Sequence, residues 1–457
     1  MPGGQVKTSP LLAELAPLVE ELLLQRPEAD RQLRLTAAAR MSGGAINQNF
    51  LIELSGEGGR TEQWVLRRSQ ARPVPGTHSR AAEFRLFQFA HEAGLCVPEP
   101  LALLESESAS VSAFRRATGE VDPRGLMAWI NGLQERSEER AARTGQHMVA
   151  ELGQQLGILH RASSGVQAER SLSAVLHERP ACGVEAALTG LRASLGLLHS
   201  PASYLRFAVE QVVADRPRRA SLRPAVLCHN DFRLGNLMFL LPPDDEALGS
   251  PGLSAVLDWE FAHWSDPMAD IGWLTAPCWR FGGAEVVAGI GPLSAFMEAY
   301  GLANPDAPPA LDELPYWQRF AQLRWALIAA QQGERAIVGQ PETLELRITG
   351  AMAASLVHPV VEHYLGHRVE PMPMPALQPQ WGAARDLLQS AAQHLRSQMP
   401  GDLPAAARYG TLMASNAIRL AYNQLLAQSA RSAHPDGDPV EVDLSRDLAV
   451  WAFRGFP

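Results

Sequence analysis

The chain has 457 residues, of which 46% are hydrophobic and 19% charged, so it is long enough for two or three folded domains. Its net charge of −9 and sequence pI near 5.8 argue against a nucleic-acid partner, because binding to phosphate backbones requires a basic surface. The four cysteines have no paired metal spacing, which indicates reduced thiols in a cytoplasmic protein.

The N-terminal segment is predicted to form a helix, because apolar residues recur at helical spacing between about residues 10 and 25. Three glutamates interrupt its leucines, so we expect neither a signal peptide nor a membrane span. Lys7 is the only lysine in the chain, which excludes a Walker A phosphate-binding loop. A basic side chain that binds phosphate is therefore expected to be an arginine.

Three short apolar runs separated by glycine-rich turns predict an antiparallel sheet after this helix. The runs are residues 32–37, 50–54 and 63–68. In the third run, alternation places Val65 and Arg67 on one face of the sheet and Arg68 on the other. Residues 79–93 then predict an amphipathic helix, with Glu83 near its start.

After a further strand at residues 101–104, the chain becomes mainly helical beyond residue 120. Residues 145–162 predict a helix that ends near His160, which we interpret as a packing and capping residue. The segment 180–218 contains arginines but no dense acidic cluster. A pocket in this segment would therefore favour an anionic ligand.

The loop from His229 to Asn236 places an acid and an amide five positions apart, between two short apolar runs. The runs, 224–228 and 237–241, are too short for helices and predict buried strands that hold the loop. A third run, 254–258, again ends on an acid. Strand ends are therefore expected to present two carboxylates and one amide.

Phosphoryl transfer requires this set of groups. One carboxylate accepts a hydroxyl proton, while an amide oxygen and a second carboxylate hold magnesium on the phosphates. The spacing His-x-Asp-x4-Asn is that of the kinase catalytic loop, so we predict Asp231 as the general base and Asn236 and Asp258 as Mg²⁺ ligands. The alternative is a β-hairpin with an ordinary Asp-Phe turn.

These residues, together with Ser265-Asp266-Pro267 and Asp270, resemble the aminoglycoside phosphotransferase or choline kinase-like family over about residues 30–365. The sequence is most similar to the branch that is fused or adjacent to acyl-CoA dehydrogenases. The resemblance implies an ATP-dependent enzyme in which Asp266 caps the next helix and Asp270 ties that helix to the catalytic loop.

The fold implied by the resemblance is α+β, a two-lobed protein-kinase-like fold followed by a small α-helical module. An antiparallel N-lobe sheet would occupy residues 1–118 and a mainly helical C-lobe residues 119–367. The proline-rich residues 368–380 predict a linker. Residues 381–457 contain two long helical patterns, 385–399 and 405–429, for which docking to a protein or dimerisation is the default role.

The resemblance also assigns contacts to ATP. The turn from Ser42 to Asn47 resembles the family's phosphate-covering loop, Arg67 stands where protein kinases carry a lysine, and Glu83 would hold Arg67. Backbone groups near residues 113–115 would meet adenine. The expected nucleotide-binding residues are Ser42, Gly43, Gly44, Asn47, Arg67, Glu83, Ala113 and Arg115. A plain hairpin, a solvated arginine pair and a surface glutamate are the alternatives.

The sequence therefore predicts an ATP- and Mg²⁺-dependent phosphotransferase that acts on a hydroxyl of a small molecule, without nucleic-acid or membrane partners. A hydroxyacyl thioester or hydroxy acid is the preferred acceptor, and an aminoglycoside or amino-alcohol is the alternative. A catalytically silent nucleotide-binding protein stays open, because Arg67 replaces the usual lysine. A metal-dependent hydrolase using His229, Asp231 and Asp258 is disfavoured, because further ligands at regular spacing are missing.

Overall fold

The structure is a computed structural model of the whole chain. It describes residues 10–41, 48–69, 77–105, 110–242, 251–336, 343–371, 391, 395, 411–418, 420 and 438–451. The chain divides into two compact units, residues 1–187 with 219–314 and residues 188–218 with 315–457. These units do not correspond one to one with the expected lobes, linker and module, whose boundaries stay a prediction.

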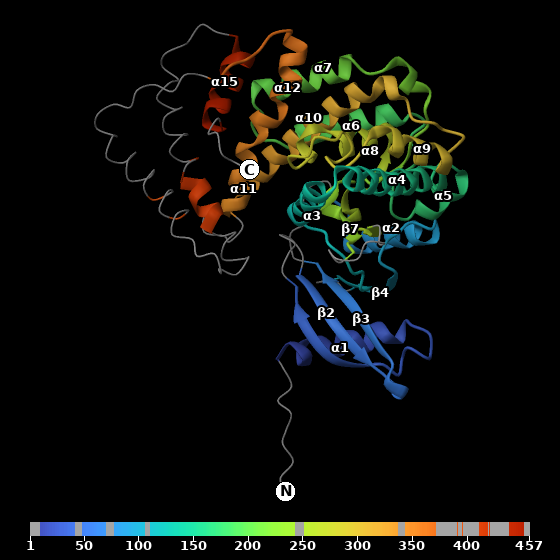
Figure 1. Cartoon of the computed structure of the whole chain (residues 1–457). Helices are drawn as coiled ribbons and strands as arrows, with labels where there is room; N and C mark the ends of the chain where they lie inside the picture. The colour runs from blue at the N-terminus through green and yellow to red at the C-terminus, as the bar shows by residue number, and fades with distance from the viewer. Residues whose placement is uncertain are drawn as a thin grey trace. The chain divides into compact units, whose positions relative to one another are not determined.

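A five-stranded antiparallel sheet forms the N-terminal part of the first unit, in the order β1-β2-β3-β5-β4 (Figure 1). The strands are β1 (Arg34–Arg40), β2 (Gln48–Ser55), β3 (Thr61–Arg68), β4 (Pro100–Glu105) and β5 (Ser110–Arg115). Alternate residues such as Ile52 and Trp64 are buried on one face, where helix α1 (Pro10–Leu24) contributes Leu15 and Leu22 to the same apolar core. Helix α1 therefore covers only one face of the sheet.

Helix α2 (Arg80–Glu92) lies against β4 and β5. Its N-cap is Ser79, whose side chain accepts a hydrogen bond from the Ala82 amide. Phe84 and Phe87 both contact Phe114 of β5, with ring centroids 5.6 and 4.7 Å apart. This apolar contact fixes the first turn of α2, and Glu83 with it, relative to the sheet.

The helical part of the first unit is built on the long helix α4 (Glu138–Ala162), which packs along α9 (Leu293–Ala303). The two backbones approach closely at Gly153, where an added Cβ would lie 2.1 Å from the Phe296 carbonyl oxygen. The other helices of this part are α3 (Pro123–Arg136), α5 (Val166–Leu172) and α8 (Pro267–Thr275). The close packing brings the C-terminal end of α4 beside Tyr300 of α9.

Two short two-stranded sheets hold the loop from His229 to Asn236. Strand β6 (Val226–Cys228) pairs with β9 (His263–Ser265), and β7 (Leu237–Leu240) pairs with β8 (Gly252–Val256). Because β6 and β7 do not pair with each other, the β-hairpin alternative is wrong.

The short 3-10 helices are η1 (Glu57–Gly59), η2 (Arg218–Leu222), η3 (Leu234–Asn236), η4 (Trp259–Phe261), η5 (Pro277–Trp279) and η6 (Leu311–Glu313).

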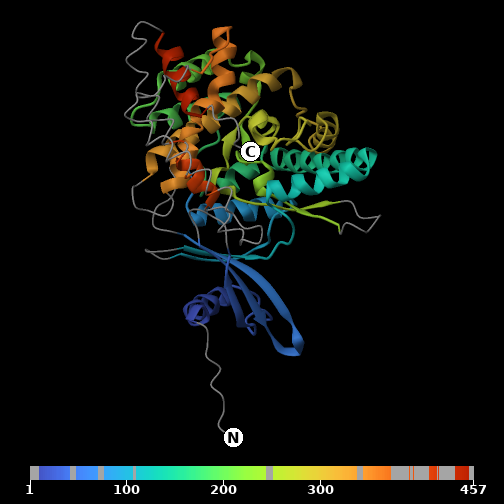
Figure 2. The same cartoon turned by 60° about the vertical axis from the view of Figure 1, so that its left-hand side comes forward.

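The second unit is helical over its described residues (Figures 1 and 2). It contains α7 (Ser203–Ala214), α10 (Leu314–Arg335) except its first residue, α11 (Thr343–Ala351), α12 (Ala353–Leu365) and α15 (Pro439–Trp451), and α6 (Gly183–Gly196) contributes its second half. Helix α15 packs on α7 and α12 of the same unit, and Tyr204 donates a hydrogen bond to Asp447 at 2.9 Å.

Helix α15 was not expected from the sequence, which predicted only the helices 385–399 and 405–429 beyond the linker. Residues 411–418 are helical, and most of the remaining residues of these two predicted helices, with residues 372–380 of the linker, lie outside the described part of the chain. The docking or dimerisation role of the C-terminal helices stays a prediction. Among the described residues, no helix combines the length and apolar content needed to cross a bilayer.

Candidate active site

The Asp231 carboxylate is held by three side chains in the loop that follows β6. Its Oδ2 accepts a hydrogen bond from Asn236 Nδ2 at 2.6 Å. Its Oδ1 accepts from Trp273 Nε1 at 3.1 Å and from Arg233 Nε at 2.9 Å. Donors on both oxygens therefore fix the orientation of this carboxylate in the loop.

Asp270 at the start of α8 fixes the backbone of this loop. Its two oxygens accept hydrogen bonds from the His229 amide at 2.8 Å and the Asn230 amide at 2.7 Å. Asn230 adopts a left-handed backbone conformation, with φ 60°, and the bond from Asp270 stabilises this sparsely populated geometry. Asp266 caps α8 by accepting from the Met268 amide at 2.9 Å. Both structural contacts predicted for these aspartates are confirmed.

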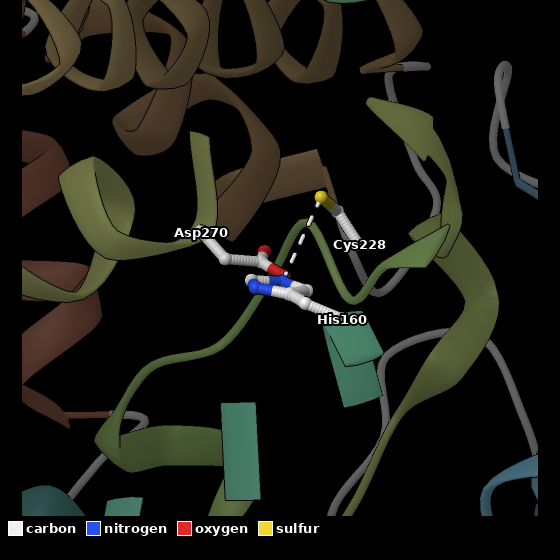
Figure 3. A group of neighbouring side chains, drawn as sticks. All are labelled: His160, Cys228 and Asp270. Atoms are coloured by element: carbon white, nitrogen blue, oxygen red, sulfur yellow. Dashed lines mark hydrogen bonds and ion pairs between the residues drawn. The ribbon is translucent and has the colours of Figure 1, made fainter. Parts of the chain in front are cut away.

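Figure 3 shows Asp270 beside His160 and Cys228, three buried side chains with potential metal-ligand atoms. His160 Nε2 lies 3.3 Å from Asp270 Oδ2, and His160 Nδ1 lies 2.8 Å from the Tyr300 hydroxyl. Burial alone would raise the pKa of Asp270, but the contact with His160 and the backbone donors bring it below its ordinary value. Because the carboxylate already accepts two amides, we interpret this cluster as structural, as predicted for His160.

His229 connects the catalytic loop to the end of β8. Its Nε2 donates to the Leu257 carbonyl oxygen at 2.9 Å, and its Nδ1 accepts from the Asp231 amide at 3.2 Å. Burial lowers the pKa of His229, which keeps the ring neutral. Both ring nitrogens are therefore engaged, and the metal-dependent hydrolase that would use His229 as a ligand does not fit.

Asn236 and Asp258 offer oxygen atoms to a cation in one pocket of about 610 Å³, which both residues line. Asn236 Nδ2 donates to two oxygens of Asp231, so the amide oxygen is the atom left for a ligand. Asp258 has φ 64°, and its side chain is 34% exposed. The Leu257 amide donates to the Asn236 carbonyl oxygen at 2.8 Å, which ties the two positions together.

Arg67 extends from β3 into this pocket. It forms an ion pair with buried Glu83, at 2.7 Å between Nη1 and Oε1, and its Nη2 lies 3.5 Å from Asp258 Oδ1. Arg68 lies on the other face, where it contacts Glu14 at 2.8 Å. The predicted ion pair and the predicted alternation along β3 are both confirmed, and Arg67 lines the same pocket as Asn236 and Asp258.

Sequence reasoning missed Arg80, which forms an ion pair with the second oxygen of Glu83. Its guanidinium is buried, and its Nε has no hydrogen-bond partner among the described residues. Burial, with the nearby charge of Arg67, lowers the pKa of Arg80 to about 9. The only sequence signal is a spacing of three residues on one helix, which places Arg80 and Glu83 on the same face.

Glu260, on the turn after Asp258, also lines the pocket. Burial and the neighbouring charge of Asp258 raise the pKa of Glu260 to about 7. Arg67, Asp258 and Glu260 therefore line the same pocket, and the charge balance among these three groups depends on the state of Glu260.

Of the remaining residues predicted to contact the nucleotide, some line the pocket and some do not. Arg115 lines the pocket, but Ala113 does not, because its side chain belongs to the buried core on the other face of the sheet. Ser42, Gly43, Gly44 and Asn47 lie outside the described residues. The pocket wall beyond Arg115 continues through residues 116–119, which no prediction included.

A sequence model of the phosphotransferase enzyme family matches residues 37–314, more than half of the chain. The chain belongs to this family. This phosphotransferase has the kinase-like α+β fold, with an antiparallel N-terminal sheet and a helical region after it. None of the curated proteins matches the sequence at a significant level.

Solved structures agree with the fold of this phosphotransferase. A putative aminoglycoside phosphotransferase from Ralstonia eutropha JMP134 is 18% identical with a TM-score of 0.54, and the match covers 77% of this chain and 98% of that one. An amicoumacin kinase in complex with AMP-PNP and Ca²⁺ is 12% identical with a TM-score of 0.43, covering 77% and 93%. A putative fructosamine-3-kinase from Haemophilus somnus 129PT is 10% identical with a TM-score of 0.42, covering 76% and 100%. At 18% identity, the likeness to the Ralstonia structure, which has a TM-score above 0.5, shows the fold alone.

Proposed function

We propose that this phosphotransferase uses ATP and Mg²⁺ to phosphorylate a hydroxyl of a small molecule, a hydroxyacyl thioester or a hydroxy acid. One observation carries the proposal: the side-chain amide of Asn236 donates to the Asp231 carboxylate, and the backbone of Asn236 is hydrogen-bonded to Leu257, the residue before Asp258, which lines the same pocket as Asn236. These are the groups that phosphoryl transfer requires.

In the proposed step, Asp231 accepts the proton of the acceptor hydroxyl. The hydroxyl oxygen forms a bond to the γ-phosphorus, the bond from that phosphorus to the bridging β,γ-oxygen breaks, and ADP leaves with the bonding electrons. Arg67 binds phosphate oxygens through its planar guanidinium. Glu83 orients Arg67, because its carboxylate is buried and cannot turn toward solvent.

The donor atoms fit magnesium, which prefers oxygen ligands and usually keeps several waters and phosphate oxygens. Asn236 and Asp258 would hold the cation, as one neutral and one anionic oxygen donor in the same pocket. A bound Mg²⁺ would neutralise charge on the phosphate oxygens.

The acceptor class rests on the sequence. The chain resembles the branch of the family that is linked to acyl-CoA dehydrogenases, and residues 180–218 lack the dense acidic cluster that a polycationic antibiotic would require. We propose a cytoplasmic location from the scattered, unpaired cysteines. A docking or dimerisation role of residues 381–457 belongs to the same proposal.

Transfer from radiolabelled ATP tests this function. The full chain is incubated with ATP and Mg²⁺ against hydroxyacyl thioesters, hydroxy acids, aminoglycosides and choline-like alcohols, with Asp231→Asn as the control. Phosphorylation of a thioester or hydroxy acid is expected. Preferred phosphorylation of an aminoglycoside or amino-alcohol would overturn the acceptor class, and binding of Mg²⁺-ATP without any transfer would indicate a silent nucleotide-binding protein.

A further inference from the structure

Arg233 donates to one carboxylate oxygen of Asp231, the proposed base. Its Nε lies 2.9 Å from Asp231 Oδ1, and the other oxygen, Oδ2, carries the Asn236 amide at 2.6 Å. The side chain of Asp231 is 10% exposed and that of Arg233 is 26% exposed. A guanidinium is therefore the more accessible partner of this pair.

Two further contacts show that the position of Arg233 is built into the site. The guanidinium carbon lies 4.7 Å from the ring centroid of Trp279, a buried residue. On the other side, an added Cβ at Gly235 would lie 2.4 Å from Arg233 Nη1. The Arg233 carbonyl oxygen accepts a hydrogen bond from the backbone amide of Asn236 at 2.8 Å, so the arginine belongs to the same turn as Asn236.

The terminal nitrogens of Arg233 remain free to bind a ligand. A guanidinium has five N–H donors, and in the described part of the chain only the one on Nε has a hydrogen-bond partner. Arg233 does not line the 610 Å³ pocket, whereas Arg67, Asn236 and Asp258 do. Arg233 is therefore not one of the residues that line the pocket assigned to the nucleotide, although Gly235, beside its Nη1, is.

We infer that Arg233 is a specificity-determining residue that binds a carboxylate or other oxyanion of the acceptor, close to the hydroxyl that is phosphorylated. This inference rests on the proposed function and narrows its acceptor class. The Nε donor stays on Asp231 Oδ1, and the terminal nitrogens hold the oxyanion, which matches the forked geometry of arginine with carboxylates. The hydroxyl and the oxyanion must then lie within one guanidinium width of each other.

Charge supports an anionic rather than a cationic acceptor at this position. An ammonium group beside Asp231 would meet the positive charge of Arg233 at the same oxygen, and like charges at such a distance repel. An oxyanion instead completes a chain of alternating charges from Asp231 through Arg233. A hydroxy acid satisfies this arrangement, whereas the neutral carbonyl of a hydroxyacyl thioester places no charge near the hydroxyl.

Binding of matched ligands tests the inference without requiring turnover. Hydroxybutyrates, the corresponding hydroxybutyramides and hydroxybutyryl thioesters are titrated calorimetrically into the full chain with Mg²⁺ and a non-hydrolysable ATP analogue. The proteins are wild type, Arg233→Gln and Arg233→Lys. Arg179→Gln is the matched control, because Arg179 is also ion-paired and lies 6.0 Å from a tryptophan centroid, Trp264, away from Asp231.

Wild type should bind the acid about tenfold to a hundredfold more tightly than the amide, as expected for charge-assisted hydrogen bonds. Arg233→Gln should lose this preference, Arg233→Lys should retain part of it, and Arg179→Gln should retain all of it. Equal binding of acid and amide by wild type, or an unchanged preference in Arg233→Gln, would overturn the inference. Weaker binding of the ATP analogue alone in Arg233→Gln would also overturn it, by assigning Arg233 to the γ-phosphate.

The result of this binding test can be distinguished from the result of the transfer assay that tests the proposed function. If no acceptor is phosphorylated but the acid preference depends on Arg233, the oxyanion site stands and the proposed reaction fails. If transfer occurs to a thioester and does not depend on Arg233, the reaction stands and the inference fails. Thermal unfolding of each variant checks that the fold is retained.

Discussion

Four aspartates between β6 and α8 form two pairs with different surroundings. Asp231 and Asp258 have side chains that are 10% and 34% exposed, and their hydrogen bonds and ion pairs are with side chains: Arg233, Trp273, Asn236 and Arg67. Asp266 and Asp270 are fully buried and accept hydrogen bonds from backbone amides, in addition to their side-chain contacts with Arg223 and His160. Backbone partners cannot leave, whereas side-chain partners can exchange for a ligand. The first pair is therefore suited to chemistry and the second to holding the loop.

The largest expected effect is at the general base. Asp231→Asn should lower turnover by about a hundredfold to ten-thousandfold and leave nucleotide binding largely intact, because the affinity for ATP depends on other groups. Steady-state kinetics and calorimetric titration of ATP measure the two quantities. Asp306→Asn, at an exposed aspartate of the same unit, is the control. Turnover that matches wild type would remove Asp231 from the reaction.

Asp258→Ala should abolish the dependence of ATP binding on Mg²⁺, because the pocket loses its anionic oxygen donor beside Asn236. The measurement is ATP affinity at several magnesium concentrations, for wild type and variant. If affinity in the variant still rises with magnesium as it does in wild type, another residue holds the cation.

Glu83 combines a feature of each aspartate pair. It is as buried as Asp270, but the described contacts of its carboxylate are with the side chains of Arg67 and Arg80. Arg67→Ala should lower kcat/KM by about tenfold to a hundredfold, through loss of charge-assisted bonds to phosphate. Glu83→Gln should have a smaller effect, because Glu83 acts through Arg67. The double variant should be little worse than Arg67→Ala.

The contacts of Glu83 decide which substitution suits this double-mutant cycle of Arg67 and Glu83. Arg80 also forms an ion pair with Glu83, so Glu83→Ala would leave a second buried guanidinium without its carboxylate and should lower stability. Glu83→Gln retains an acceptor oxygen and is the better variant. Additive losses of kcat/KM in the cycle would show that Arg67 and Glu83 do not act as one unit.

The smallest effect on turnover is expected at the buried pair. Asp270→Asn keeps one acceptor oxygen for two backbone amides, so it should lower the free energy of unfolding by roughly 1–3 kcal/mol and slow turnover less than Asp231→Asn. Urea unfolding followed by tryptophan fluorescence measures the first quantity. Unchanged stability with a loss of turnover as large as that of Asp231→Asn would assign Asp270 a chemical role.

The difference in unfolding free energy between wild type and Asp270→Asn should depend on pH in a defined direction. The pKa of Asp270 in the folded chain lies below its ordinary value of 3.8, so folding favours the ionised carboxylate. Its contribution is present at neutral pH and is lost as pH falls through the folded pKa. The stability difference between wild type and Asp270→Asn should therefore shrink in acid, below about pH 4.

Local patterns in the sequence predict the parts of the site that depend on local geometry. Alternation along residues 63–68 separates Arg67 from Arg68, and the amphipathic pattern of residues 79–93 predicts the helix that brings Glu83 to Arg67. The motif from His229 to Asn236 places the acid and the amide five residues apart, which is within reach of one loop. These predictions need only periodicity, capping and short-range spacing.

Contacts between distant segments could not be predicted in this way. Trp273 reaches Asp231 across 42 residues, and Tyr300 reaches His160 across 140. Such contacts depend on how helices α4, α8 and α9 pack, which the pattern of apolar residues does not specify. The role of Arg233 was missed for a different reason, because an arginine two residues from an aspartate can equally point to solvent.

The ring of His229 sets the spacing between the two chemically active strand ends. One imidazole nitrogen is bonded to the residue before Asp258 and the other to the amide of Asp231 itself, so a rigid planar group, rather than the mobility of a loop, defines that separation. Protonation of Nδ1 would break the bond to Asp231, but burial lowers the pKa of His229 and opposes it. Burial of the imidazole therefore opposes the one protonation that would loosen the connection between Asp231 and the strand end that carries Asp258.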